Sequence, residues 1–156
     1  MGKKKQLKKQ KALKNNKNIS EDLRKTPDIR QNLVQWTVCE MDYEYSKPWN
    51  WDLKGKEAHK VLGYLEGLSQ KTWGEVDQER TGNRDRHRKH HSTPVSRLSK
   101  KARDRLKERF KDEELPEELY RFRLEGEVRL WGIRSGRTFK LIWYDRDHQV
   151  YPTERK

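Results

Sequence analysis

Residues 119–152, which read LYRFRLEGEVRLWGIRSGRTFKLIWYDRDHQVYP, are the stretch that decides the fold. Three runs rich in aromatic and β-branched side chains are separated by short breaks that contain Gly126 and Gly136, and such breaks are typical of tight antiparallel hairpins. We therefore predict a β-meander with strands at residues 120–124, 128–133 and 138–144.

The alternation of side chains within these runs predicts which face each residue occupies. In the first run the apolar residues share one face, and Arg121 and Arg123 lie on the other. The third run has large side chains on both faces, so we predict that it is the central strand. A turn at residues 145–148 follows, in which Asp145 suits Asx-type capping, and residues 149–151 are expected to form a short closing strand.

The pattern of residues 32–75 predicts one strand and two helices. Apolar and aromatic residues at 32–45 predict a strand, with Cys39 as a buried structural thiol. Apolar side chains at three- and four-residue steps predict an amphipathic helix over residues 53–69, and Asp52 is a suitable N-cap. Residues 72–75 have the form of a capping box, so a second, short helix should begin there.

Residues 80–93 have no large apolar side chain and predict a loop. Thr93-Pro94 has the N-cap and first-turn proline pattern that starts a helix, whose apolar stripe runs from Val95 to Phe110. The resulting fold class is α+β, of order β-α-α-β-β-β, with an antiparallel sheet covered by helices on one face. We expect a single domain at residues 32–156 after a flexible basic arm at residues 1–31.

Charge is concentrated in two blocks. The chain is 40% charged and 30% hydrophobic, with a formal net charge of +13. Residues 1–32 hold eleven Lys and Arg against three acidic residues, and residues 80–111 hold thirteen against three. Such blocks point to a polyanion, which is either nucleic acid or an anionic surface. The arm either reaches phosphates or is a solvated tail that aids solubility.

Several classes of protein are excluded by composition. The single cysteine rules out an internal disulfide and a cysteine-based zinc site, and it suits a reducing compartment. No apolar run is long enough for a membrane span, and the N-terminus lacks the apolar core of a signal peptide, so we expect a cytoplasmic protein. His87, His90 and His91 suggest a metal site, but neighbouring cations repel a divalent ion. We therefore predict no metal and no cofactor.

The candidate nucleic-acid ligands are cationic side chains of the meander, the loop and the third helix. We assign this role to Arg121, Arg123, Arg84, Arg86, His87, Arg88, Lys89, Arg97, Lys100 and Lys101. The alternative is that Arg121 and Arg123 form the solvent face of an edge strand and that the loop is merely solvated. Arg134 and Arg137, beside a hairpin turn, are expected to be solvated.

Metal-free RNA cleavage needs a base for the 2′-hydroxyl proton, cations on the phosphate and an acid for the leaving oxygen. His148 is the candidate acid or base because its reference pKa is near neutral. Arg129 suits the phosphate because its planar fork binds oxyanions bidentately. Tyr144 or Tyr151 would position a base or ribose. Alternatively, Asp145 and His148 only cap the turn.

Four segments, KTWGEV, PVSRLSKKARDRL, LYRFRL and residues 128–152, resemble a family of small bacterial and phage proteins. The ends of that family read roughly W-G-I-R…F-x-x-x-W-x-D-x-x-H-x-V-x-P, and the likeness covers residues 33–152. The family has no assigned activity to carry over.

The element order, together with the arginines and His148, looks like the RelE/ParE-type toxins, in which a small sheet flanked by helices presents Arg, Lys, Tyr or His to RNA. This resemblance implies an RNA-binding endoribonuclease or translation inhibitor, acting on free or ribosomal RNA and neutralised by a protein antitoxin. Two alternatives remain open at this point. One is a non-enzymatic nucleic-acid-binding accessory protein of a phage or host that uses the arm and the Arg/His loop, and the other is a basic protein–protein module.

Overall fold

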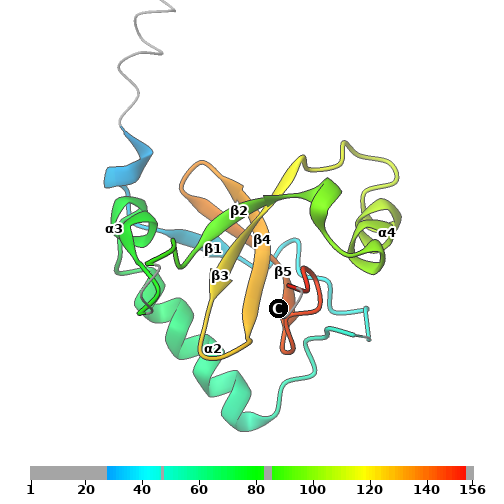
Figure 1. Cartoon of the computed structure of the whole chain (residues 1–156), viewed down its shortest axis with the longest axis horizontal. Helices are drawn as coiled ribbons and strands as arrows, with labels where there is room; N and C mark the ends of the chain where they lie inside the picture. Colours follow the sequence, from blue (N-terminus) through cyan, green and yellow to red (C-terminus); the bar gives the residue numbers. More distant parts are fainter. Residues whose placement is uncertain (1–27, 47, 83–85, 154–156) are drawn as a thin grey trace, which may run out of the picture.

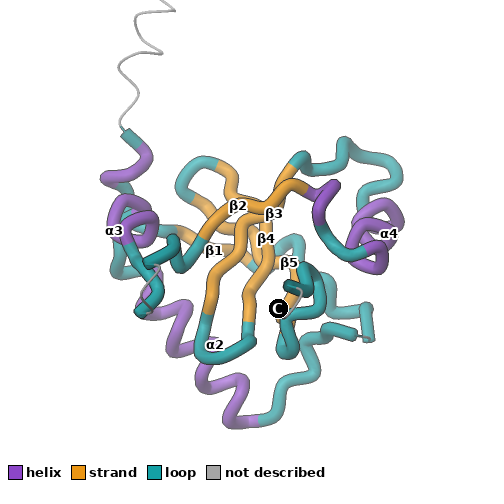
Figure 2. Tube along the Cα trace, in the orientation of Figure 1, coloured by secondary structure: helices purple, strands orange, loops and turns teal. Residues whose placement is uncertain are grey.

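The computed structural model describes residues 28–46, 48–82 and 86–153. The fold is α+β, with one five-stranded sheet of strand order β1-β5-β4-β3-β2 (Figures 1 and 2). The elements in chain order are η1 (Ile29–Gln31), β1 (Gln35–Thr37), α2 (Gly55–Leu68), α3 (Trp73–Gln78), β2 (His91–Pro94), η2 (Val95–Arg97), α4 (Lys100–Arg109), β3 (Glu118–Arg123), β4 (Arg129–Ser135) and β5 (Thr138–Asp145). Most of the predicted arm lies outside the described residues, but its last residues form η1, which Asp28 caps.

The predicted meander is confirmed as β3, β4 and β5, which pair antiparallel in sequence order. The sheet is nevertheless mixed, because β1 pairs parallel with β5. The prediction that the third meander strand is central was wrong: β4 is central, and β5 lies between β4 and β1. Both faces of β5 are covered, as its sequence indicated, because apolar layers lie on each side of the sheet.

Gly132 marks an irregularity in the β4–β5 pairing. The register shifts between Trp131 and Gly132, as at a β-bulge, and Ile142 and Trp143 of β5 both join the same core. A Cβ atom at position 132 would clash with the carbonyl oxygen of Lys140. Only glycine allows the two strands to approach this closely here.

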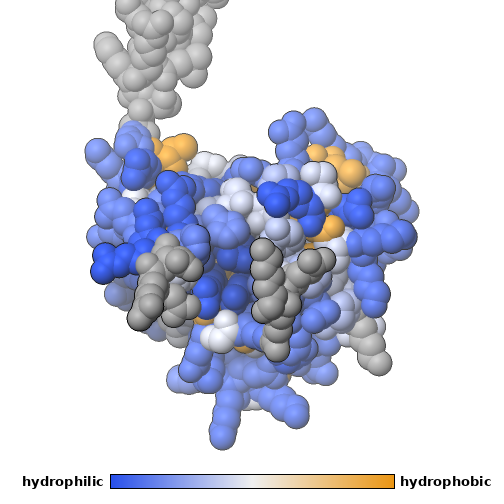
Figure 3. Space-filling view, in the orientation of Figure 1, coloured by the Kyte–Doolittle hydropathy of each residue, from blue (hydrophilic) through white to orange (hydrophobic). Residues whose placement is uncertain are grey.

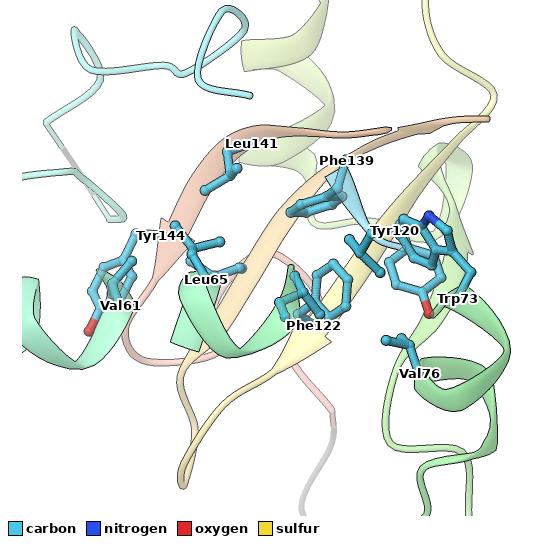
Figure 4. Packing of buried hydrophobic residues seen from close by; sticks show 12 residues of the cluster. Val61, Leu65, Trp73, Val76, Tyr120, Phe122, Phe139, Leu141 and Tyr144 are labelled. Carbon is cyan, nitrogen blue, oxygen red and sulfur yellow. The ribbon is translucent and has the colours of Figure 1, made fainter. Parts of the chain in front are cut away.

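One face of the sheet is covered by α2 and α3. Val61 of α2 lies beside Tyr144, and Trp73 of α3 lies beside Tyr120 (Figure 4). The predicted capping box of α3 is confirmed, with Thr72 and Glu75 each bonding the backbone of the other. The predicted α2 helix is also confirmed, although Lys54 rather than Asp52 is its N-cap residue.

The other face of the sheet is covered in part by α4, so the expectation that helices cover one face only was wrong. Ala102 and Leu106 of α4 pack with Leu119, Trp131 and Trp143 of the sheet. In Figure 1, α3 and α4 lie at opposite ends of the sheet. The part of this face that α4 leaves uncovered is where polar side chains can be presented.

The segment around Thr93-Pro94 also differs from expectation. It belongs to β2, an edge strand that pairs antiparallel with β3, and not to a helix. The helix begins later, where the Ser99 side chain caps the backbone N–H of Ala102. Serine and threonine before a proline can start a helix or end an edge strand, and pairing with β3 decides between them.

Two expectations for the first strand were wrong. The strand spans three residues, Gln35–Thr37, instead of the whole of residues 32–45. Cys39 lies beyond its end and is exposed, so it is no core thiol.

Arg134 is not simply solvated. Its guanidinium lies 3.8 Å from the centroid of a Trp73 ring and pairs with Asp77 at 3.3 Å. Arg137 is exposed, as expected. No helix in the described part of the chain has the length and apolarity needed to span a bilayer.

Candidate nucleic-acid interface

The α4 face carries two rows of cross-strand neighbours, one of which runs from the sheet edge at His91 to Trp131 and Trp143 beneath α4. Partner residues on adjacent strands share a face, so the register places whole rows side by side. The rows are His91–Arg121–Trp131–Trp143 and Arg123–Arg129–Asp145. We call His91, Arg121, Arg123, Arg129 and His148 the arginine–histidine site.

Arg121 is the centre of the site and is only 8% exposed. Its Nη2 atom lies 2.8 Å from Nε2 of His91, and its Nη1 atom lies 3.4 Å from Nε2 of His148. A guanidinium has no acceptor, so both imidazoles accept through Nε2 and carry their proton on Nδ1. Four predicted residues, Arg121, Arg123, Arg129 and His148, are therefore brought to one face, together with His91.

Arg129 is 5% exposed and lies beside Arg123 across the β3–β4 pair. Its Nη1 atom donates to the carbonyl oxygens of Gly126 and Val128 at 2.8 and 3.0 Å. The Nε atoms of Arg121 and Arg129 have no hydrogen-bond partner among residues 28–46, 48–82 and 86–153. Within the described residues, no carboxylate forms an ion pair with any of the three arginines.

Burial and mutual repulsion weaken the hold of these guanidinium groups on their protons. Burial, followed by the charges of Arg121 and Arg123, lowers the pKa of Arg129 to about 10, against the opposing charges of Asp145 and Glu127. Burial and the charge of Arg123 lower the pKa of Arg121 as well. All three arginines remain cations at neutral pH, in a setting that favours an anion.

Asp145 holds the turn that places His148. Its carboxylate accepts hydrogen bonds from Trp131 Nε1 and from the backbone N–H groups of Gln149 and Val150, at 3.2, 2.7 and 3.0 Å. Asp145 is 1% exposed, and burial raises its pKa. The predicted Asx-type cap is confirmed, but residues 149–151 form no strand. Within this turn His148 adopts a left-handed φ of 57°.

Both histidines of the site are neutral at physiological pH. Burial, then the charges of Arg129 and Arg121, lowers the pKa of His148 to about 4, and Glu127 opposes this. Burial and Arg121 also lower the pKa of His91, whose Nδ1 atom lies 3.2 Å from the carbonyl oxygen of Ser92. The site thus holds three cations and two uncharged imidazoles.

The two predicted tyrosines are separated by the sheet. Tyr144 lies on the α2 face, where its hydroxyl donates to Glu57 at 3.1 Å and burial raises its pKa to about 12. It is therefore not part of the arginine–histidine site. Tyr151 is half-buried on the α4 side, in the neighbourhood of Arg121.

The predicted loop ligands lie near the site only at their C-terminal end. Arg84 lies outside the described residues, and Arg86, His87 and Arg88 are exposed. Lys89 pairs with Glu79 at 3.7 Å and lines a cavity of about 240 Å³ with Arg80 and Arg123. Arg123 therefore connects the arginine–histidine site to the basic loop.

The cations before and within α4 are solvent-exposed. Arg97, Lys100 and Lys101 are all exposed, and Lys100 pairs with Asp104 at 2.8 Å. No contact joins them to the arginines of β3 and β4 among the described residues. They add positive charge to the surface without shaping the site.

Sequence reasoning did not assign His90 and His91 a role in the site. His90 is 1% exposed, accepts a hydrogen bond from the backbone N–H of Arg123 and contacts Glu79 through Nε2 at 3.0 Å. It thereby fixes the end of β3, while the next residue enters β2 opposite Arg121. The only local signal for this strand was Thr93-Pro94, which equally fits a helix start.

No group of three or more His, Cys, Asp or Glu side chains in the described ranges is placed to hold a metal ion. The face of the molecule in Figure 3 is hydrophilic over most of its area, with small, separate hydrophobic spots. No protein-family model, curated protein or solved structure matches the chain. Functional conclusions therefore rest on the geometry and chemistry of the arginine–histidine site.

Proposed function

We propose that this protein binds RNA through backbone phosphates at the arginine–histidine site and cleaves it as a metal-independent, toxin-like endoribonuclease. The observation that carries the proposal is the pair of guanidinium groups, Arg121 and Arg129, which are more than nine-tenths buried and form no ion pair with a carboxylate of the described residues. A buried charge is costly unless it is paired. An oxyanion from outside supplies the missing partner.

A phosphate fits this site better than a carboxylate does. Three arginines lie in two adjacent cross-strand pairs, and the planar fork of each can bind two phosphate oxygens. The basic cavity beside Arg123 provides cations for a neighbouring phosphate. A chain of phosphates with a net charge opposite to +13 therefore matches both the site and the surface around it.

RNA is favoured over DNA because two neutral imidazoles lie beside the phosphate ligand Arg121. A neutral imidazole can exchange a proton with a ribose 2′-hydroxyl, which DNA lacks. The toxin-like part of the proposal rests on element order: one strand and two helices precede the meander, with β2 and α4 inserted between them. A protein antitoxin that covers the site is the partner this reading implies.

A second candidate, a nucleic-acid-binding accessory protein without catalysis, is favoured by one observation. In the free protein the Nε2 atom of His148 accepts from Arg121, and the pKa of His148 is about 4. The Nε2 lone pair of His148 is therefore engaged, and the second proton that a general acid would donate is absent. On this candidate the protein would bind RNA and leave it intact.

RNA cleavage in EDTA with purified wild-type protein and His148→Ala tests the proposal. We expect the wild type to cleave single-stranded RNA and His148→Ala to bind the same RNA with cleavage slowed by about 100-fold or more. His59→Ala is the matched control, because His59 is an exposed histidine on α2. Binding without cleavage by the wild type would favour the accessory protein, and absence of binding would contradict both candidates.

A further inference from the structure

His91 and His148 reach the same guanidinium from two sides. His91 comes from β2, on the edge of the sheet, whereas His148 comes from the turn after β5. Their Nε2 atoms contact different terminal nitrogens of Arg121, Nη2 and Nη1. A phosphate bound at this guanidinium would therefore have one imidazole on each side.

We propose that His91 and His148 form a general base–general acid pair that cleaves RNA at a phosphate held by Arg121 and Arg129. This inference rests on the proposed function and adds to it a second catalytic residue and the class of product. Flanking positions suit in-line displacement, because the attacking and leaving oxygens lie on opposite sides of the phosphorus.

The base is assigned to His91 because its tautomer places the lone pair on Nε2, which must release the Arg121 hydrogen bond to take a proton, since burial and Arg121 lower the pKa of His91 in the free protein. Its Nδ1–H donates to the carbonyl oxygen of Ser92, which leaves the lone pair on Nε2 and stabilises the imidazolium once it forms. The shorter contact, 2.8 Å to Arg121, fixes the ring. His91 thus holds a defined tautomer before RNA arrives.

The acid is assigned to His148, which has the longer contact of 3.4 Å and must first gain a proton. The charged groups acting on it are Arg121 and Arg123 from β3, Arg129 from β4 and Glu127 from the β3–β4 hairpin. His91 on β2 is the other titratable group at the Arg121 guanidinium, and Asp145 and Asp147 lie on the same turn as His148. A phosphate bound among the arginines offsets their charge, so the pKa of His148 rises and RNA and proton bind together.

The reaction balances without a metal or cofactor. The 2′-hydroxyl gives its proton to Nε2 of His91, and O2′ forms a bond to phosphorus. The bond from phosphorus to O5′ breaks, and O5′ keeps the electron pair and takes the proton of His148. The products are a 2′,3′-cyclic phosphate and a free 5′-hydroxyl, with His91 protonated and His148 neutral.

A substrate with a sulfur leaving group separates the two roles. The probe is a DNA oligomer that contains one ribonucleotide, in which the following 5′ bridging atom is either oxygen or sulfur. A thiolate leaves without an acid, so loss of the acid is rescued by sulfur and loss of the base is not. The variants are His91→Gln and His148→Gln, since a glutamine oxygen can still accept from Arg121 but cannot transfer the proton.

We expect both variants to cleave the oxygen substrate at least 100-fold more slowly than the wild type. His148→Gln should return to within a few-fold of the wild type on the sulfur substrate, and His91→Gln should stay slow. The all-deoxy oligomer should bind all three proteins within a few-fold, and matching thermal unfolding should show that the variants fold.

The pairing is overturned if either variant cleaves the oxygen substrate at the wild-type rate or if sulfur fails to rescue His148→Gln. Rescue of His91→Gln instead would overturn the assignment of roles. Wild-type protein that binds the oligomer without cleaving it also overturns the pairing but leaves RNA binding intact. Protein that does not bind RNA contradicts the proposed function itself.

Discussion

Two pairs of arginines lie on the α4 side of the sheet, and they differ in what neutralises them. Arg105 and Arg109 of α4 both contact Asp42, at 2.7 and 3.3 Å, and Arg105 also donates through Nε at 2.8 Å. Trp143 donates to the same carboxylate at 2.9 Å. Burial alone would raise the pKa of Asp42, but these hydrogen bonds and charges hold it below its usual value.

Arg121 and Arg129 are more deeply buried than Arg105 and Arg109, and in the described part of the chain no carboxylate pairs with them in this way. Asp145, the nearest acid in their rows, uses its oxygens on Trp131 and the backbone of the following turn. Burial of a cation therefore does not by itself identify function. A buried cation with an internal partner fastens the fold, whereas one without a partner is available to an external anion.

Removing the carboxylate of the neutralised pair should have the largest effect on stability. Asp42→Ala removes the buried acceptor that Arg105, Arg109 and Trp143 share, so we expect the free energy of unfolding to fall by about 3 kcal/mol. Urea denaturation at neutral pH measures this loss. Glu44→Ala, at an exposed acid two residues away, is the control. A loss below about 1 kcal/mol would mean that the ion pairs of Arg105 and Arg109 with Asp42 do not stabilise the packing of α4.

Lowering the pH should reduce the free energy of unfolding through His90 and His148 in one pH range and through Asp42 in another. His90 and His148 have pKa values of about 4, below the ordinary 6.5, so the unfolded chain binds protons that the folded chain does not between these values. Stability therefore falls as the pH drops from about 6.5 to 4, by at most on the order of 3 kcal/mol for the fully buried His90. The lowered pKa of Asp42 instead costs stability only below pH of about 4.

Denaturation curves at pH 7.5, 5.5 and 4.5 test this separation. His148→Gln should reduce the loss of stability over this range, and Asp42→Ala should lower stability by the same amount at pH 7.5 and 5.5. An unchanged pH slope in His148→Gln would show that this histidine is not held neutral by its arginine neighbours.

Apolar replacement should act in opposite directions on the two pairs. Arg129→Met removes a buried cation that pairs with no carboxylate of the described residues, and with it two hydrogen bonds to backbone carbonyls, so we expect the free energy of unfolding to rise by only about 1 kcal/mol. Arg105→Met removes the bidentate partner of Asp42 and should lower the free energy of unfolding. Thermal unfolding of both variants at low salt measures the two signs. A change of the free energy of unfolding in the same direction for both variants would contradict the distinction between the two pairs of arginines.

The sheet itself could be predicted because its strands are encoded locally. Alternation placed Arg121 and Arg123 on one face, and the turn glycines marked the hairpins. The length of the first strand, the β2 strand and the covering of the second face by α4 could not be predicted, because tertiary pairing and packing define them. The apolar stripe of α4 was visible in the sequence, but a stripe does not say which face it meets.

Only some of the site residues could be predicted from the sequence. Arg121, Arg129 and His148 were candidates from residue type, yet only the strand register and the Asp145 turn bring them together. His91 was assigned to a loop that either faces phosphates or is solvated, because no apolar alternation surrounds it. Tyr144 was a candidate because alternation does not distinguish a face that binds a ligand from one that packs against α2.

Arg121 and Arg129 are proposed to bind an RNA phosphate. The salt dependence of the affinity for RNA is the most direct test of this proposal. The measurement is the affinity of wild type, Arg129→Met and Arg137→Met for single-stranded RNA over a series of salt concentrations. Arg137 is the matched control because it is an exposed arginine at the other end of β4.

We predict that Arg129→Met loses about tenfold or more in affinity and that its slope of log K against log salt is shallower by about 0.7, one phosphate contact. Arg137→Met should stay close to the wild type. Equal affinity and slope for wild type and Arg129→Met would contradict the account.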